Sequence, residues 1–387
     1  MACKPSDNLL TRLVGKYLHN EWFFSFKSGN ETTTIPFEVI NGWIIIKVKI
    51  GKEEHRFLFD TGASTSIEPE ITNELFLPSI RDFTTIDANG IDRKVPLVYI
   101  PKLTLGNRTF THIGAFSTSH QSTKCIGVKG VIGHNLLYGS VWKINFQDKT
   151  ITISQQTDKS SFNLEKFNLI KIKTDWKKMM YLRLTTDRGQ IDAVLDTGLP
   201  NYILINKKFI NHFNKTDLVK KKINYIGSAN SSLIDTISMY KANNIRLSDI
   251  PIDKDILIFS NLESSVGCGF LSYFQEIVIN LREKRLLLSK NELSKVERKP
   301  VNINISWKDG VTRVTGLAIN SKMEKAGLKT GDQIISINCI STDLFQNACE
   351  YKAFESTMDI YKSDIELSIL RDGQKYNYTF SKDMMYE

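Results

Sequence analysis

The stretch HRFLFDTGAST, residues 55–65, decides the fold that we expect for this chain of 387 residues. Its apolar run Phe-Leu-Phe is typical of a short buried strand, and Asp60-Thr61-Gly62 follows directly. Gly62 permits a tight turn at a point where a Cβ atom would clash. The sequence therefore predicts an aspartate delivered at the end of a buried strand, on a tight loop.

A second copy of this pattern, AVLDTGL at residues 193–199, supplies Asp196, Thr197 and Gly198. A single Asp-Thr-Gly would occur by chance in about a tenth of chains of this length, given average residue frequencies. Two copies, each behind an apolar run, instead indicate an internal repeat.

The pair resembles the catalytic signature of aspartic proteases of the retropepsin and pepsin type. An apolar segment containing glycine follows each copy, as VIG up to Gly133 and as VGCG up to Gly269. Asp60 to Gly133 and Asp196 to Gly269 each span 73 residues. This equal spacing predicts two duplicated lobes, one at 34–155 and the other at 163–291.

The resemblance implies a mechanism and a set of roles. Asp60 and Asp196 would form a dyad that activates a water for attack on a peptide bond, with no metal, cofactor or covalent intermediate. The two threonines of the motifs would lock the loops together across the lobe interface, and the two glycines would permit the close approach. These supporting loop residues are Thr61, Gly62, Thr197 and Gly198.

Residues 84–95 place Asn89 and Gly90 between two arms of high β-propensity, which is the strongest short-range signal for a hairpin. In the aspartic protease family a hairpin in this part of the lobe is the flap that closes over the substrate. Asn89 and Gly90 are therefore flap candidates, and the alternative is an ordinary surface hairpin.

The second motif departs from the family pattern, because Leu199-Pro200 follows where Ser, Thr or Ala is usual. Leucine removes a hydroxyl, and proline fixes φ and removes a backbone donor. Three functions therefore stay open. They are an endopeptidase with an Asp60/Asp196 dyad, a non-catalytic peptide-binding protein with a degenerate protease-like body, and a protease active only as a homodimer that pairs two Asp60 residues.

Residues 298–387 read as a third unit. The segment SKMEKAGLKTGDQIISIN, residues 321–338, resembles the PDZ pattern of bacterial proteases, with a helix ending at Gly327 and a turn at Gly331. Such a domain would bind a peptide by strand addition, or else serve only for packing or regulation. The expected fold is mainly β, with two tandem retropepsin-like β-barrel lobes and a C-terminal α+β PDZ-like domain, behind a lead segment at 1–33.

Composition narrows the function classes. The net charge of +9 is spread along the chain, and no motif supports nucleic-acid binding. The densest basic run, residues 220–222, is expected on a solvated face. Five scattered cysteines predict neither a disulfide framework nor a zinc site, and the histidines lack metal-ligand spacing.

The first residues, MACKPSDN, resemble the start of a mature bacterial lipoprotein, in which Cys3 would carry a lipid anchor. That resemblance implies a protein of the bacterial cell envelope. The alternative is a cytoplasmic protein whose native start is Met1. No apolar run reaches the length of about 18 residues that a transmembrane helix requires.

Overall fold

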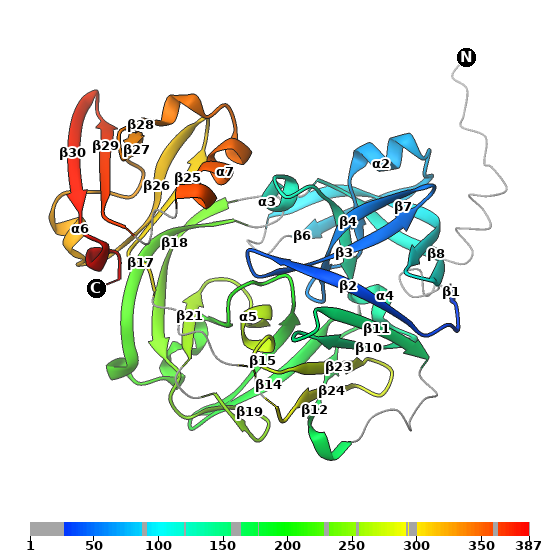
Figure 1. The fold of residues 1–387 in the computed structure, drawn as a ribbon. Coiled ribbons are helices and arrows are strands. Elements are labelled where there is room, and N and C mark those ends of the chain that lie inside the picture. The colour runs from blue at the N-terminus through cyan, green and yellow to red at the C-terminus, as the bar shows by residue number, and fades with distance from the viewer. Residues whose placement is uncertain are drawn as a thin grey trace.

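The computed structural model describes residues 27–86, 91–119, 121–155, 164–176, 178–227, 232–252, 255–291, 293, 300–358 and 363–386. The expectations for Cys3, for most of the lead segment and for Asn89 and Gly90 fall outside these residues. In the described part the chain is mainly β, as predicted (Figure 1). No helix within these ranges is long and apolar enough to cross a membrane.

The first lobe is a set of mostly antiparallel strands that surround the strand ending at Asp60. Asn41 and Gly42 connect its first long hairpin with φ values of 55° and 84°. A two-residue hairpin loop of type I′ requires positive φ at both central residues, which explains the Asn-Gly pair. The elements of this lobe are β1 (Lys27–Ser28), β2 (Thr33–Ile40), β3 (Trp43–Ile50), β4 (Glu53–Asp60), β5 (Ser66–Ile67), α2 (Pro69–Glu74), β6 (Ser79–Ile86), β7 (Asp92–Leu105), β8 (Arg108–Ser117), α3 (Gln121–Lys124), β9 (Val128–Gly133), α4 (His134–Leu137), β10 (Ser140–Asn145) and β11 (Thr150–Gln155).

The second lobe repeats this path around the strand that ends at Asp196. Its helical turns are η1 (Leu164–Lys166), η2 (Lys207–His212), η3 (Lys215–Asp217) and α5 (Cys268–Leu271). Its strands are β12 (Phe167–Lys171), β13 (Lys173–Thr174), β14 (Met180–Thr186), β15 (Gly189–Asp196), β16 (Ile203–Asn206), β17 (Leu218–Gly227), β18 (Ser232–Lys241), β19 (Ile245–Leu247), β20 (Ile250–Pro251), β21 (Ile256–Ser260), β22 (Ser265–Gly267), β23 (Glu276–Asn280) and β24 (Arg285–Ser289).

The strand register corrects the predicted match between the two repeats. Asp60 of β4 lies opposite Gly133 of β9, and Asp196 of β15 lies opposite Gly267 of β22. Gly133 therefore corresponds to Gly267 and not to Gly269, so the spacing is 73 residues in one lobe and 71 (196 to 267) in the other. The segment around Cys268 contains two glycines, and apolar pattern alone could not choose between them.

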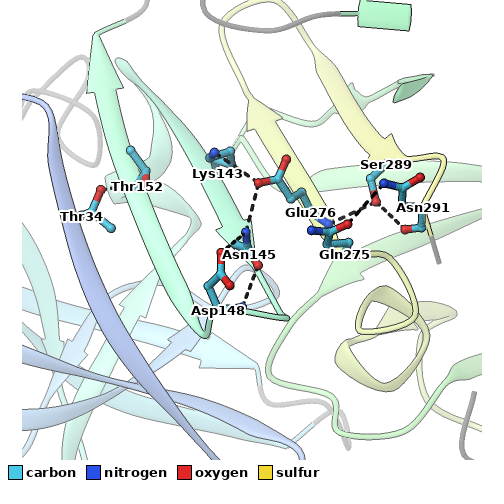
Figure 2. Close-up of polar contacts among 9 residues, drawn as sticks. All are labelled: Thr34, Lys143, Asn145, Asp148, Thr152, Gln275, Glu276, Ser289 and Asn291. Carbon is cyan, nitrogen blue, oxygen red and sulfur yellow. Dashed lines mark hydrogen bonds and ion pairs between the residues drawn. The ribbon is translucent and has the colours of Figure 1, made fainter. Parts of the chain in front are cut away.

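The two lobes share one sheet, in which β12, β24, β23, β10, β11 and β2 are successive neighbours. Val141 of β10 pairs with Asn280 of β23 at the junction between the lobes. Glu276 of β23 accepts from Lys143 at 3.3 Å and from Asn145 at 3.1 Å, as Figure 2 shows. One buried apolar core runs beneath this sheet through both lobes, so the lobes form one body.

The C-terminal domain, residues 300–386 as described here, has a buried core of its own that includes Leu328, Tyr351 and Ile369. Its assignment as PDZ-like stays a prediction. Its elements are β25 (Ile303–Lys308), β26 (Val311–Ala318), α6 (Lys322–Lys325), β27 (Gln333–Ile337), β28 (Ile340–Ser341), η4 (Thr342–Leu344), α7 (Ala348–Met358), β29 (Ile365–Arg371), β30 (Gln374–Phe380) and η5 (Lys382–Met385).

Several contacts join this domain to the body, and two of them correct an expectation from the sequence. Lys222 of β17 pairs with Ala318 of β26 and is only 2% exposed, so the basic run does not lie wholly on a solvated face. Its Nζ donates to Asn304 Oδ1 at 2.7 Å. Cys125, directly after α3, forms a disulfide with Cys349 of α7, which lies 224 residues later in the chain, whereas no disulfide framework was expected from the cysteine spacing.

Candidate active site

Each Asp-Thr-Gly motif begins at the end of a buried strand, as predicted. Phe57 and Phe59 of β4 and Leu195 of β15 are completely buried, and this anchors both strands in the core. The parallel strands β9 and β22 pair with the last residues of β4 and β15, and this pairing fixes the position of each aspartate. Asp60 and Asp196 thus reach the lobe interface from two related strand ends.

The two threonines of the motifs form a reciprocal set of hydrogen bonds across the interface. Thr61 donates from its hydroxyl to the Leu195 carbonyl at 2.6 Å, and Thr197 donates from its hydroxyl to the Phe59 carbonyl at 2.8 Å. Each hydroxyl also accepts from the backbone N–H of the other threonine, at 3.0 Å in both directions. Both side chains are completely buried, so these four bonds form without competing water.

The two glycines of the motifs lie against the opposing carboxyl groups. A Cβ atom on Gly62 would lie 2.5 Å from Asp196 Cγ, and one on Gly198 would lie 2.2 Å from Asp60 Oδ2. Real Cβ atoms do not approach other heavy atoms so closely, so only glycine fits at either position. This crossed arrangement brings Asp60 and Asp196 face to face.

The two carboxyl groups hydrogen-bond each other, and their pKa values rise for related reasons. Burial raises the pKa of Asp60. Burial raises the pKa of Asp196 well above its ordinary value, and the charge on Asp60 raises it further. Two interacting buried carboxyl groups cannot both ionise cheaply, and this favours a pair that shares one proton.

Backbone amides supply the remaining donors to the pair. The Gly62 N–H donates to Asp60 Oδ1 at 2.8 Å, and the Leu199 N–H donates to Asp196 Oδ1 at 3.0 Å. Donors of this kind stabilise the charged form of a carboxylate and oppose the effect of burial. The arrangement can therefore hold one neutral and one ionised carboxyl group side by side.

Residues that the sequence reasoning did not assign hold the first loop in place. Asn135 Oδ1 accepts from the Thr65 hydroxyl at 2.7 Å and from the Thr65 N–H at 2.8 Å. The Gly133 N–H donates to the Thr65 hydroxyl at 3.0 Å, and His134 Nδ1 lies 2.7 Å from the Ala63 carbonyl. Two polar residues directly after an apolar Gly-containing segment were the signal for this anchor. His134 is buried and is the first residue of α4.

The hairpin that carries the flap candidate is described only in its arms. β6 and β7 pair antiparallel up to Ile86 opposite Asp92. Its predicted tip, Asn89 and Gly90, lies outside the described residues, so the flap assignment stays a prediction. Within the described ranges no group of His, Cys, Asp or Glu side chains has the arrangement of a metal site.

Comparison with known proteins matches residues 46–136 to a family model described as aspartyl protease. No curated protein matches the sequence. Similar solved structures include an aspartic proteinase from Irpex lacteus, 12% identical over 68% of this chain and 98% of that one, with a TM-score of 0.39. A retropepsin-like aspartic protease from Rickettsia conorii is 17% identical over 33% of this chain and 93% of that one, with a TM-score of 0.23. The basic 7S globulin from soybean is 9% identical over 68% of this chain and 96% of that one, with a TM-score of 0.38.

Proposed function

We propose that this chain is an aspartic endopeptidase whose dyad, Asp60 and Asp196, comes from one polypeptide. The match of residues 46–136 to the aspartyl protease family model supports this proposal. The observation that carries the proposal is the crossed fit of Gly62 against Asp196 and of Gly198 against Asp60. The reciprocal threonine bonds support it, because they would keep the two carboxyl groups at a fixed separation.

In the proposed reaction Asp60 is the base and Asp196 is the acid. Ionised Asp60 takes a proton from a water molecule as the water oxygen bonds to the carbonyl carbon of the peptide. Asp196 gives its proton to the carbonyl oxygen, which produces a neutral tetrahedral intermediate. The intermediate collapses when its C–N bond breaks, Asp60 passes its proton to the leaving amine, and Asp196 recovers a proton from the hydroxyl that becomes the new carboxyl group.

Isosteric Asp→Asn substitutions test this proposal. Asp60→Asn and Asp196→Asn should each lower the cleavage rate of an unfolded protein substrate on the order of 10³-fold, since positioned acid–base groups supply about 10²–10⁴-fold. Asp192→Asn is the matched control, because Asp192 lies on the same strand, β15, but is exposed and paired with Lys173.

Three results would contradict an endopeptidase with an Asp60/Asp196 dyad or favour one of its alternatives. Cleavage that survives both Asn substitutions would contradict the proposal. Activity of Asp196→Asn in a dimer would favour the pairing of two Asp60 residues. A protein that binds unfolded peptides at every pH from 3 to 8 but cleaves none would favour the peptide-binding function.

We also propose that the C-terminal domain recruits a peptide or protein substrate. Among the described residues one edge of β25 pairs with β26, and its other edge pairs with no strand. Helix α7 packs beside β25. An extended peptide could add to an edge of this kind. The test measures binding of labelled peptides to the full-length double variant Asp60→Asn with Asp196→Asn. This variant is expected not to cleave the peptides during the measurement.

The proposed location is the bacterial cell envelope. Disulfides persist in oxidising compartments and are rare in the cytosol, so the bond between Cys125 and Cys349 supports this placement. Fractionation of the producing cell tests it, and a fully reduced protein in the cytoplasmic fraction would contradict it.

A further inference from the structure

The two active-site loops are anchored differently. In the first lobe the loop after Gly62 is held by the side chain of Asn135, which binds both the N–H and the hydroxyl of Thr65. The strand register makes Gly269 the counterpart of Asn135, because Gly133 matches Gly267. Glycine has no side chain, so the second loop lacks this anchor.

Backbone bonds hold part of the second loop. The Cys268 N–H donates to the Leu199 carbonyl at 2.8 Å, and the Gly267 N–H donates to the Tyr202 carbonyl at 2.7 Å. Neither of these bonds involves the carbonyl of Gly198.

Trp43 of the first lobe binds that carbonyl. Its Nε1–H donates to the Gly198 oxygen at 2.9 Å, across 155 residues of sequence. The adjoining hairpin tip packs against the same loop, since a Cβ atom on Gly42 would lie 2.8 Å from Pro200 Cβ. The hairpin formed by β2 and β3 therefore contacts the second loop from the opposite lobe.

The Gly198 carbonyl and the Leu199 N–H belong to one peptide group, and that N–H is the donor to Asp196 Oδ1 at 3.0 Å. A hydrogen bond to the oxygen of an amide polarises its N–H and strengthens the bond on the other side. We propose that Trp43 is a positioning residue for Asp196, which acts through this single peptide group in place of the side-chain anchor that the second loop lacks.

In the described part of the chain, the position that corresponds to Trp43 carries no N–H donor side chain. The same strand register relates Trp43 of β3 to Met179, just before β14. A thioether has no hydrogen to donate. The contact made by Trp43 therefore acts on the loop of Asp196.

This inference rests on the proposed function, because it assigns a role to Trp43 in the same reaction. Trp43→Phe keeps an aromatic ring but removes the donor, and Trp176→Phe is the control at a position that is 75% exposed. We expect Trp43→Phe to lower kcat about three- to ten-fold with little change in KM, because it acts on the acid and not on substrate binding.

The pH profile separates positioning from simple packing. Weakening one charge-assisted hydrogen bond by about 10–30% should raise the pKa of Asp196 and move the alkaline limb of the kcat profile upward on the order of 0.3 pH unit. A drop in stability with an unmoved limb would overturn the proposal, as would kinetics equal to those of Trp176→Phe.

A second measurement does not require activity. Carboxyl ¹³C NMR of labelled aspartate can follow the titration of Asp196 in the wild type and in Trp43→Phe, even if the proposed proteolysis fails. The same upward shift is expected, and its absence overturns the inference independently of the proposed function. Replacing Trp43 by benzothienylalanine, which keeps the bicyclic shape without the N–H, gives the same test should Trp43→Phe not fold.

Discussion

Replacing Thr197 by valine tests how the two lobes are held together at the active site. The hydroxyl of Thr197 donates to the Phe59 carbonyl and accepts from the Thr61 N–H, and all these groups are buried. Valine has a similar shape, so the change deprives two buried backbone groups of this partner without opening a large cavity. At about 1–3 kcal/mol for each such group, we expect the variant to be about 4 kcal/mol less stable.

Urea unfolding measures this loss, and amide hydrogen exchange at Thr61 locates it. The Thr61 amide should exchange faster in Thr197→Val, because its acceptor across the interface is gone. Thr34→Val is the matched control. Thr34 is exposed, and its hydroxyl lies 2.9 Å from that of Thr152 between neighbouring strands, as Figure 2 shows. Water can replace that bond, so the control should cost less than about 0.5 kcal/mol.

The double variant Thr61→Val with Thr197→Val tests whether the four bonds act as one unit. The two hydroxyls contact different backbone groups, so independent bonds would give additive losses. If the first substitution already loosens the interface, the double variant should lose about 1–2 kcal/mol less than the sum. Wild-type stability, exchange and activity in Thr197→Val would refute the reasoning that these bonds fix the separation of Asp60 and Asp196.

Two further predictions concern charge and covalent linkage. Burial raises the pKa of Asp60 and Asp196 above 3.8, so between that value and the higher folded values the native state binds more protons than the unfolded chain. Stability should therefore fall as pH rises through the folded pKa values. Asp196→Asn should flatten this decline and be more stable than the wild type at pH 8, although inactive; calorimetry at pH 4 and 8 checks this, and a steeper decline in the variant would contradict it. For the disulfide, Cys349→Ser opens a loop of 224 residues, which the chain-entropy model values at about 5 kcal/mol. We expect faster amide exchange in α3 and α7 of that variant, and non-reducing peptide mapping of the wild type should recover Cys125 and Cys349 in one linked fragment.

Local patterns predicted the parts of the fold that local physics determines. The pair Asn41-Gly42 is typical of a two-residue hairpin loop because few residue pairs tolerate positive φ twice in succession, and the structure has both angles. The apolar runs before Asp60 and Asp196 predicted buried strands, because apolar side chains are stabilised by burial in the core, away from water.

Features that depend on distant pairing could not be predicted in this way. The bond between Cys125 and Cys349 joins the first lobe to the C-terminal domain across 224 residues of sequence. Lys222 lies in a run of three lysines, but alternate residues of a strand face opposite sides. Lys221 is exposed, while Lys222 points into the junction with the C-terminal domain and lies within 3.1 Å of the Val301 carbonyl. Burial lowers the pKa of Lys222 to about 7, an effect that composition gives no means to anticipate.

The departure at Leu199-Pro200 shows why a motif should be judged by the atoms it provides. Leucine at this position lacks a hydroxyl, and this raised the alternative of a degenerate second lobe. The donor that reaches Asp196 is, however, the backbone N–H of Leu199, which any residue except proline supplies. Proline comes one position later, where its ring packs against Gly42 and no bond to Asp196 is lost. The sequence change therefore removes nothing that this geometry uses, and the loop instead gains a contact with the opposite lobe.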